Sequence, residues 1–286
     1  MGSKTKIDWC DATWNPVTGC LHGCEYCYAR KIAERFGSGL TPLFTNYPVL
    51  DKPVYYIDAY GYTLDAGISG GKIQPYPFDF TPTFHRYKLG EPARWKKPRN
   101  IFVCSMADLF GDWVPDEWIA DVFDACEAAP QHRYLFLTKN PKRLTRMAYA
   151  YKVYRWNEKH MGTPHPDTLK VGNVELPVHD NWWFGSTIDN ADARRFNGNF
   201  RWNTFTSIEP LMEHMHMGIG SFGMDQWTII GAETGKRKNK VIPCREWVEN
   251  IVQAADLTGV KIFMKESLRD LMGDDFRQEF PWEAAE

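Results

Sequence analysis

Three cysteines lie within eight residues near the start of the chain, in the segment Cys20-Leu-His-Gly-Cys24-Glu-Tyr-Cys27. The C-x3-C-x2-C spacing allows three thiolates to hold three corners of a [4Fe–4S] cluster, whose full ligation by protein takes four ligands. Three ligands leave one iron open, and an open metal position can bind and activate another molecule. The motif therefore predicts a metal centre that does chemistry rather than one that only stores electrons or braces the fold.

Two other interpretations of the cysteines stay open. A zinc ion would take Cys10 or His22 as its fourth ligand, but structural zinc sites usually combine two cysteine or histidine pairs, and only half of that pattern is present. The cysteines could also bind no metal. The chain has seven cysteines in 286 residues, and a random arrangement would rarely place three of them in so short a segment.

Composition limits the classes of protein to consider. The net charge of −2 gives no overall sign of a nucleic-acid or membrane partner. No run of about 18 apolar residues could span a bilayer, and residues 1–14 lack the apolar stretch of a signal peptide. We therefore expect a cytoplasmic protein without a membrane segment. An odd number of cysteines in a chain of this length argues against a disulfide framework.

Short runs of apolar or aromatic residues recur along the chain, each ending in small, polar or charged residues. They cover residues 100–108, 133–139, 182–187, 203–209, 227–233 and 260–265. Such runs are typical of buried parallel strands. Helical patterns lie between most of them, at residues 29–36, 116–129, 141–151 and 245–257. The alternation predicts an α/β fold with a parallel sheet, and its six or so units predict a partial or full (β/α) barrel with insertions.

We expect one domain over residues 1–286, because no clear boundary divides the chain. Two stretches interrupt the alternation of strands and helices. Residues 37–98 are rich in Gly, Pro and Tyr and predict an irregular insertion or lid, because plain connections are rarely so long. Residues 152–181 predict a second irregular loop.

Polar residues follow the predicted strands at the edge where ligands gather in such barrels. They are Ser105, Asp108, Thr138, Lys139, Ser186, Thr187, Glu209, Glu233 and Lys265. Glu209, Glu233 and Lys265 are the candidate catalytic residues, for substrate or cofactor binding or for proton transfer. The alternative is a salt-bridge network that orders the rim, because a buried carboxylate must be solvated or paired.

The cysteine motif, with an aromatic residue before its third cysteine, resembles that of the radical S-adenosylmethionine enzymes. Further segments are similar to one branch of them, the phage Gp37/Gp68-like family of unknown function. These segments run in order along the chain, at residues 7–20, 95–103, 105–110, 137–141, 207–211, 230–235 and 262–265. The resemblance covers the chain nearly from end to end. It implies a partial six-stranded parallel barrel of the radical S-adenosylmethionine type, with insertions.

The resemblance also implies cofactors and binding residues. A [4Fe–4S] cluster on Cys20, Cys24 and Cys27 would bind S-adenosylmethionine and cleave it reductively to a 5′-deoxyadenosyl radical, which abstracts hydrogen from a substrate. Implied cofactor-binding residues are Tyr26 beside the adenine, Ser105 and Asp108 at the methionine amino group, and Thr187 and Asp189 at the ribose. Ordinary turn and cap chemistry is the alternative for Asp108 and Asp189.

Partners and substrate are less specified by the sequence. The resemblance implies an electron donor such as a flavodoxin or ferredoxin, and the host cytoplasm if the chain is phage-encoded. We favour a nucleobase, nucleoside or nucleic-acid substrate because of two basic runs, at residues 94–99 and 236–240, for which solvated loops are the alternative. A zinc-binding module and a cluster protein that only transfers electrons remain the other functional classes.

Overall fold

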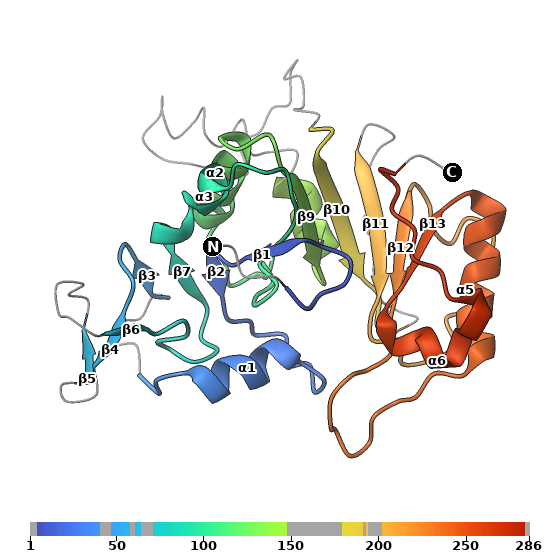
Figure 1. Cartoon of the computed structure of the whole chain (residues 1–286), viewed down its shortest axis with the longest axis horizontal. Coiled ribbons are helices and arrows are strands. Elements are labelled where there is room, and N and C mark those ends of the chain that lie inside the picture. Colours follow the sequence, from blue (N-terminus) through green and yellow to red (C-terminus); the bar gives the residue numbers. More distant parts are fainter. Residues whose placement is uncertain are drawn as a thin grey trace.

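The centre of the molecule is a curled sheet of seven parallel strands (Figure 1). The computed structural model describes residues 5–40, 47–57, 61–63, 71–147, 179–190, 193 and 202–283. The strand order is β1 (Ala12–Trp14), β8 (Asn100–Val103), β9 (Arg133–Thr138), β10 (Trp182–Thr187), β11 (Asn203–Ile208), β12 (Trp227–Ile230) and β13 (Lys261–Met264). Among the described residues β1 and β13 do not pair, so the barrel is partial, as predicted. It has seven strands because the segment leading into the cysteines also pairs, with β8.

Both faces of the sheet are buried, which explains why its strands are continuous apolar runs in the sequence. All four residues of β12 are buried, and so are three of the four in β8. Alternate residues of the sheet pack with Trp9 into one largely aromatic cluster that includes Phe102, Phe205 and Trp227. The chain is 15% aromatic, and many of its aromatic rings therefore lie in the core.

Helices cover the outer face of the sheet, and a proline and a glycine mark the ends of two of them. Pro115 precedes α3 (Asp116–Glu127), which buries Trp118, Val122 and Cys126 at helical spacing. Gly259 ends α5 (Arg245–Thr258) in the left-handed conformation, with φ of 73°. Residues 141–147 are helical, and the rest of the helix predicted over 141–151 lies outside the described residues. The other helices are α1 (Tyr28–Phe36), α2 (Glu91–Arg94), α6 (Arg269–Met272), η1 (Arg86–Lys88), η3 (Glu266–Leu268) and η4 (Gly273–Asp275).

The described parts of residues 37–98 contribute to two small sheets. In one, β7 (Thr83–His85) lies between β2 (Val17–Thr18) and β3 (Val49–Leu50). The other consists of β5 (Gly61–Thr63), β4 (Tyr55–Ile57) and β6 (Lys72–Ile73). Because β2 leads directly into the cysteine segment, its pairing with β7 connects the insertion to that segment. A lid function for the insertion stays a prediction, and most of the loop predicted over 152–181 lies outside the described residues.

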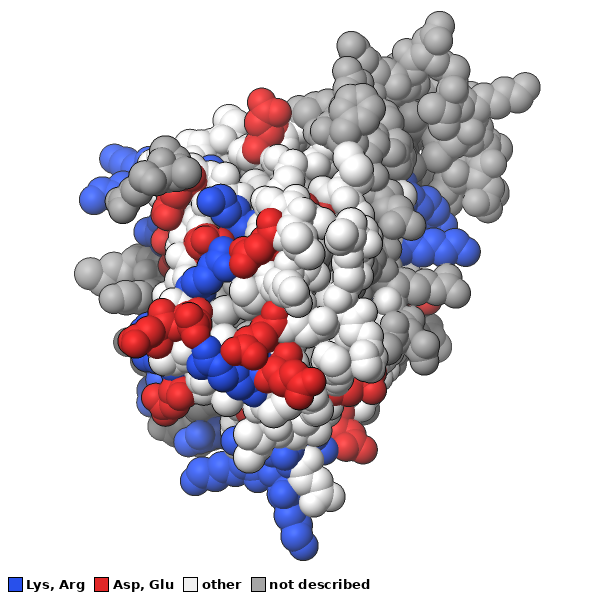
Figure 2. All heavy atoms as spheres, turned by 90° about the vertical axis from the view of Figure 1, so that its right-hand side faces the viewer, with Lys and Arg blue, Asp and Glu red and all other residues white. Residues whose placement is uncertain are grey.

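Acidic and basic side chains are interspersed on the face of the molecule that carries α5 (Figure 2). Several of them form exposed ion pairs, such as Arg245 with Glu249 and Arg277 with Asp256. Exposed pairs of this kind contribute little to stability because water screens them. None of the helices among the described residues is long and apolar enough to cross a membrane.

Candidate functional site

The three motif cysteines lie in a loop between β2 and α1 that two glycines shape. Gly19 and Gly23 have φ angles of 87° and 72°, in the left-handed region that favours glycine. A Cβ atom on Gly19 would lie 2.4 Å from the carbonyl carbon of Thr81, so this position also needs the absence of a side chain. The Gly19 amide donates a hydrogen bond to the carbonyl oxygen of Met106 (2.9 Å), which joins the loop to the segment after β8.

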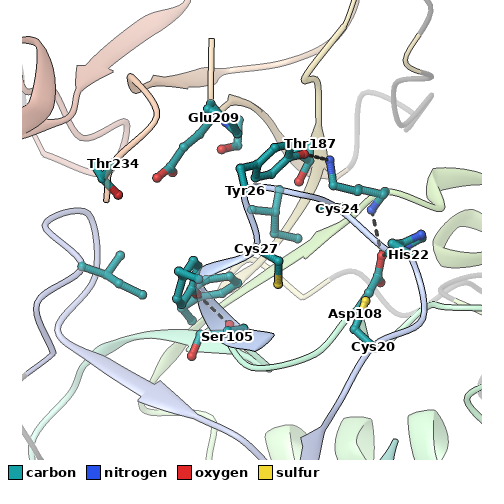
Figure 3. Close-up of a pocket in the computed structure, with 18 of the residues that line it drawn as sticks. Cys20, His22, Cys24, Tyr26, Cys27, Ser105, Asp108, Thr187, Glu209 and Thr234 are labelled. Atoms are coloured by element: carbon teal, nitrogen blue, oxygen red, sulfur yellow. Dashed lines mark hydrogen bonds and ion pairs between the residues drawn. The ribbon is translucent and has the colours of Figure 1, made fainter. Parts of the chain in front are cut away.

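Cys20, Cys24 and Cys27 line one cavity of about 210 Å³ at the carboxyl ends of the strands (Figure 3). All seven cysteines of the chain are free. Cys27 caps α1, and its sulfur accepts a hydrogen bond from the Arg30 amide (3.3 Å). Burial raises the pKa of the Cys20 thiol to about 12, so metal binding there must release a proton.

Among the described residues, no three side chains of His, Cys, Asp or Glu are gathered as ligands of one metal ion. In a cubane cluster each cysteine binds a different iron, so its ligands stand further apart than those of one ion. Three thiols around one cavity, with an amide directed at one sulfur, fit the needs of a cluster.

Most of the other predicted site residues line the same cavity. They are Tyr26, Ser105, Asp108, Thr187, Glu209, Glu233 and Lys265. Asp189 is not among the lining residues, but it contacts two of them. The floor includes the apolar side chains of Trp9, Phe102 and Leu137. The prediction that strand ends meet at one edge therefore located the cavity, whereas its floor was not predicted, because those residues look like ordinary core.

Asp108 connects the cysteine loop to the ends of two strands. One carboxylate oxygen lies 2.7 Å from His22 Nε2 and accepts a hydrogen bond from the Lys139 amide (2.9 Å). The other accepts hydrogen bonds from the Thr138 hydroxyl (2.7 Å) and the Phe110 amide (3.0 Å). The bond to the Phe110 amide is the turn cap that was the alternative interpretation of Asp108. The bonds to His22, Thr138 and Lys139 also connect this turn to the cysteine loop and to the end of β9. Binding of a cofactor by Asp108 stays a prediction.

Ser105 follows β8 and is held from two sides. Its hydroxyl donates to the side-chain oxygen of Asn15 (3.2 Å), which also accepts a hydrogen bond from the Met106 amide (2.9 Å). The Tyr28 hydroxyl donates to the Ser105 carbonyl oxygen (2.7 Å). Cys104, just before it, has a φ of 59° that turns the chain sharply after the strand. The result is a tight segment beside the cysteine loop.

Tyr26, Lys139 and Asp189 form a closed cluster across the cavity from Ser105. The Lys139 ammonium donates to the Tyr26 hydroxyl (2.7 Å) and to the Asp189 carboxylate, which also accepts from Tyr26. Burial raises the pKa of Asp189, but hydrogen bonds from Lys139 and Tyr26 outweigh it and hold the pKa below its ordinary value. Asp189 is therefore a paired carboxylate, and its predicted contact with a ribose stays untested.

Glu209 and Lys265 form an ion pair at the ends of β11 and β13. Gly231, at the end of the intervening strand β12, leaves room for it, because a Cβ atom there would lie 2.8 Å from Lys265 Cδ. Both side chains keep part of their surface open and line the cavity. Lys139 and Lys265 both follow strands, but among the described residues only Lys265 pairs with a strand-end glutamate.

Glu233 pairs with Arg237, which lies in one of the two basic runs. The guanidinium binds both carboxylate oxygens at 2.7 Å, and the Val241 amide donates to one of them (3.3 Å). The hydrogen bonds from Arg237 hold the pKa of Glu233 below its ordinary value. Arg237 also reaches Glu25 in the cysteine loop, at 3.3 Å. Sequence reasoning missed Arg237, although its i, i+4 spacing from Glu233 was visible.

Comparisons with known proteins add one family match. A family model described as "Protein of unknown function (DUF5131)" matches residues 4–269. No curated protein matches the chain. The phage Gp37/Gp68-like resemblance is not named by this model and stays a prediction.

Two solved structures are also similar in part. One, "Spore photoproduct lyase complexed with dinucleoside spore photoproduct", aligns with 90% of this chain and 64% of its own, at 11% identity and a TM-score of 0.41. The other, a point mutant of spore photoproduct lyase, aligns with 92% of this chain and 78% of its own, at 10% identity and a TM-score of 0.46. The chain thus spans less than two thirds of the first structure. Neither alignment assigns an activity to this chain.

Proposed function

The chain belongs to the DUF5131 family of proteins of unknown function, and we propose from its own residues that it is a radical S-adenosylmethionine enzyme. Cys20, Cys24 and Cys27 would hold a [4Fe–4S] cluster. The main support is that the three thiols of the C-x3-C-x2-C motif share one cavity at the carboxyl ends of a parallel partial barrel. When bound, the cluster supplies an electron that cleaves S-adenosylmethionine to methionine and a 5′-deoxyadenosyl radical for hydrogen abstraction.

The cysteine loop has the contacts that such a centre requires. The Arg30 amide donates to the Cys27 sulfur, and amide donors of this kind tune metal–thiolate centres. Asp108 holds the loop through His22. With Gly19 and Gly23 these contacts fix the backbone around the thiols before any metal binds.

Polar groups along the cavity suit the two ends of S-adenosylmethionine. We propose that Ser105 binds near the methionine amino group, with Asp108 orienting the loop beside it. Tyr26 would lie at the adenine and Thr187 near the ribose. The existing bonds of Asp189 to Tyr26 and Lys139 favour a role in positioning Tyr26.

Glu209 and Lys265 are the proposed catalytic pair. Both face the cavity, where they can bind a polar group of the substrate or move a proton after hydrogen abstraction. Glu233 has both oxygens bound by Arg237, so we propose that it anchors the chain after β12 instead. Trp9, Phe102 and Leu137 give part of the cavity an apolar lining. Such a lining suits a radical reaction, because the radical must be kept away from water.

The test is anaerobic purification followed by measurement of iron, sulfide and zinc. We expect about four iron and four sulfide per chain, since a cubane cluster contains four of each, and formation of 5′-deoxyadenosine when S-adenosylmethionine and a reductant such as a reduced flavodoxin are added. Cys24→Ala should lose the cluster. Cys244→Ala is the matched control, because Cys244 is exposed and lies outside the cavity. Stoichiometric zinc without sulfide would refute the proposal, and a cluster that never yields 5′-deoxyadenosine would indicate electron transfer alone.

A further inference from the structure

Two exposed segments meet at the mouth of the cavity. The first is α1, whose residues Tyr28 and Ala29 line the cavity. The second is residues 233–240, which follow β12 and line the cavity through Glu233 and Thr234. Arg237 joins them by its contact with Glu25, two residues before Cys27. We refer to α1, Glu25 and residues 233–240 together as the mouth surface.

The mouth surface is basic, in contrast to the chain as a whole. It contains three acidic residues, Glu25, Glu34 and Glu233, and seven basic ones, Arg30, Lys31, Arg35, Lys236, Arg237, Lys238 and Lys240. Its net charge is thus +4, whereas that of the chain is −2. Among the described residues, the exposed lysines Lys236, Lys238 and Lys240 have no ion-pair partner. Lys and Arg side chains project from the lower end of the molecule in Figure 2. The connection from β12 to α5 lies at the same height in Figure 1, because the two views differ only by a turn about the vertical axis.

The exposed side of α1 is aromatic and apolar as well as basic. Tyr28, Ile32 and Phe36 follow one another at intervals of four residues, so they form one stripe, about 12 Å long at 1.5 Å per residue. Their exposed fractions are 48%, 37% and 51%. The Tyr28 hydroxyl is bound to the Ser105 carbonyl oxygen, which fixes the ring at the cavity. The Arg35 guanidinium lies 5.2 Å from the centre of the Phe36 ring.

We propose that the mouth surface binds a single-stranded nucleic acid and presents one of its bases to the cavity. Basic side chains that follow the phosphates, and exposed aromatic rings on which bases stack, are the two components of single-strand binding sites. A base can enter the cavity only when it is unstacked, which a single strand allows without opening a duplex. A reaction on that base would depend on the proposed radical enzyme function. Binding of the strand to the mouth surface does not depend on it.

Continuity with the cavity favours a strand over a folded acidic protein. A ligand that covers both Tyr28 and Thr234 spans the mouth, and a flexible strand can cross it and enter. The other basic run, residues 94–99, directly precedes β8 and so lies at the opposite edge of the sheet from the cavity. It provides a natural control.

The experiment measures binding of fluorescein-labelled 12-nucleotide single strands of DNA and RNA, and of the matching duplexes, by fluorescence anisotropy at 50 and 200 mM salt. The test variant is Lys236→Glu/Lys238→Glu/Lys240→Glu. The control variant, Arg94→Glu/Lys96→Glu/Lys97→Glu, makes the same charge change at three exposed residues of the other basic run. Thermal unfolding of both variants verifies that they are folded.

We expect at least a tenfold loss of single-strand affinity in the test variant and less than a threefold loss in the control. The slope of log K against log salt should fall by about 2, as loss of three phosphate contacts on a single strand predicts. Phe36→Ala should weaken binding about tenfold through lost stacking, and Phe36→Tyr should restore it.

Several results would overturn the proposal. They are no binding of any strand by the wild-type protein at 50 mM salt, equal losses in the two triple variants, and duplex binding as tight as single-strand binding. Binding of a fluorescein-labelled acidic flavodoxin is measured in the same assay; if the test variant loses only that binding, the proposal is wrong and the mouth surface is a protein-docking site. Iron, sulfide and 5′-deoxyadenosine, measured on the wild-type protein without nucleic acid, test the proposed function independently.

Discussion

At the scale of single residues, each acidic side chain of the site has a specific partner. Asp189 pairs with Lys139, Glu209 with Lys265 and Glu233 with Arg237. Such pairing is required because an uncompensated carboxylate is costly to bury. The pairs do not exclude a catalytic role, since the Glu209–Lys265 pair stays partly open to the cavity.

Replacing Lys139 tests the strength of the cluster around Tyr26. Lys139→Met leaves the Asp189 carboxylate, which is 19% exposed, without its cation. We expect a loss of about 1.5–3 kcal/mol in the free energy of unfolding, the range for hydrogen bonds to charged groups. Urea denaturation at pH 7 measures it.

The double variant Lys139→Met/Asp189→Asn serves as the control. If the pair contributes as the geometry indicates, the double variant should be less destabilised than the two single variants added together. Strict additivity would show that the two side chains do not interact in solution.

At the scale of elements, the cysteine loop depends on backbone conformation as much as on its side chains. Gly19 combines a positive φ with close packing against the Thr81 carbonyl, whereas a Cβ atom on Gly23 would meet nothing within 4 Å. The two glycines are therefore needed for different reasons.

This difference predicts a ranking of two alanine variants. Gly23→Ala should cost only the left-handed backbone penalty, about 1–2 kcal/mol. Gly19→Ala should cost more and lower the iron bound per chain, because the loop must also move away from Thr81. Iron analysis after anaerobic reconstitution, together with urea unfolding, measures both. Equal effects of the two substitutions would contradict this account.

The pairing of β2 with β7 includes a buried histidine. His85 is fully buried, with Nε2 2.9 Å from the Thr18 hydroxyl and Tyr87 and Lys88 nearby. Burial holds the pKa of His85 well below its ordinary value, and the charge of Lys88 adds to the effect. The histidine is therefore neutral in the folded protein at neutral pH.

A pH dependence of stability follows from this depressed pKa. The unfolded chain takes up a proton on His85 below about pH 6.5 and the folded chain does not, so His85 favours unfolding progressively as the pH falls. The expected loss reaches at most about 2 kcal/mol at pH 5. In urea unfolding at pH 7 and pH 5, His85→Gln should lose less stability between the two values than the wild-type protein. An equal loss would mean that His85 titrates normally.

At the scale of the whole molecule, the contact of Arg237 with Glu25 joins segments 212 residues apart. It links the connection after β12 to the cysteine loop, which belongs to the other end of the open sheet. The same arginine holds Glu233, whose side chain is 2% exposed. One residue thus connects the two sides of the cavity mouth.

Arg237→Gln should loosen both segments. We expect faster hydrogen exchange at the Val241 amide, which donates to Glu233, and in peptides that cover the cysteine loop. Arg245→Gln, which breaks exposed ion pairs of α5, should leave the cysteine loop unchanged. Exchange that changes only in residues 233–241 would show that the contact with Glu25 does not restrain the loop.

The strands and the edge at which the site lies were predictable from sequence for a local reason. A strand buried on both faces is largely apolar over its length, as in Trp227–Ile230. The first polar residue after such a run marks the carboxyl end of the strand. The extra strand β1 was harder to assign, because Ala12–Trp14 is too short to show a pattern. Trp9 and Phe102 could not be distinguished from ordinary core residues.

The sequence by itself determined the cysteine motif, the parallel α/β fold and the set of polar residues at the strand ends, because spacing and burial pattern are properties of neighbouring residues. Only the tertiary structure decided which of those residues interact. Lys139 binds Asp189. Arg237 belongs to a basic run, yet its side chain binds Glu233 and Glu25. Ion pairs form over a few ångströms, and the distance between residues far apart in the chain is set by how the strands and loops pack.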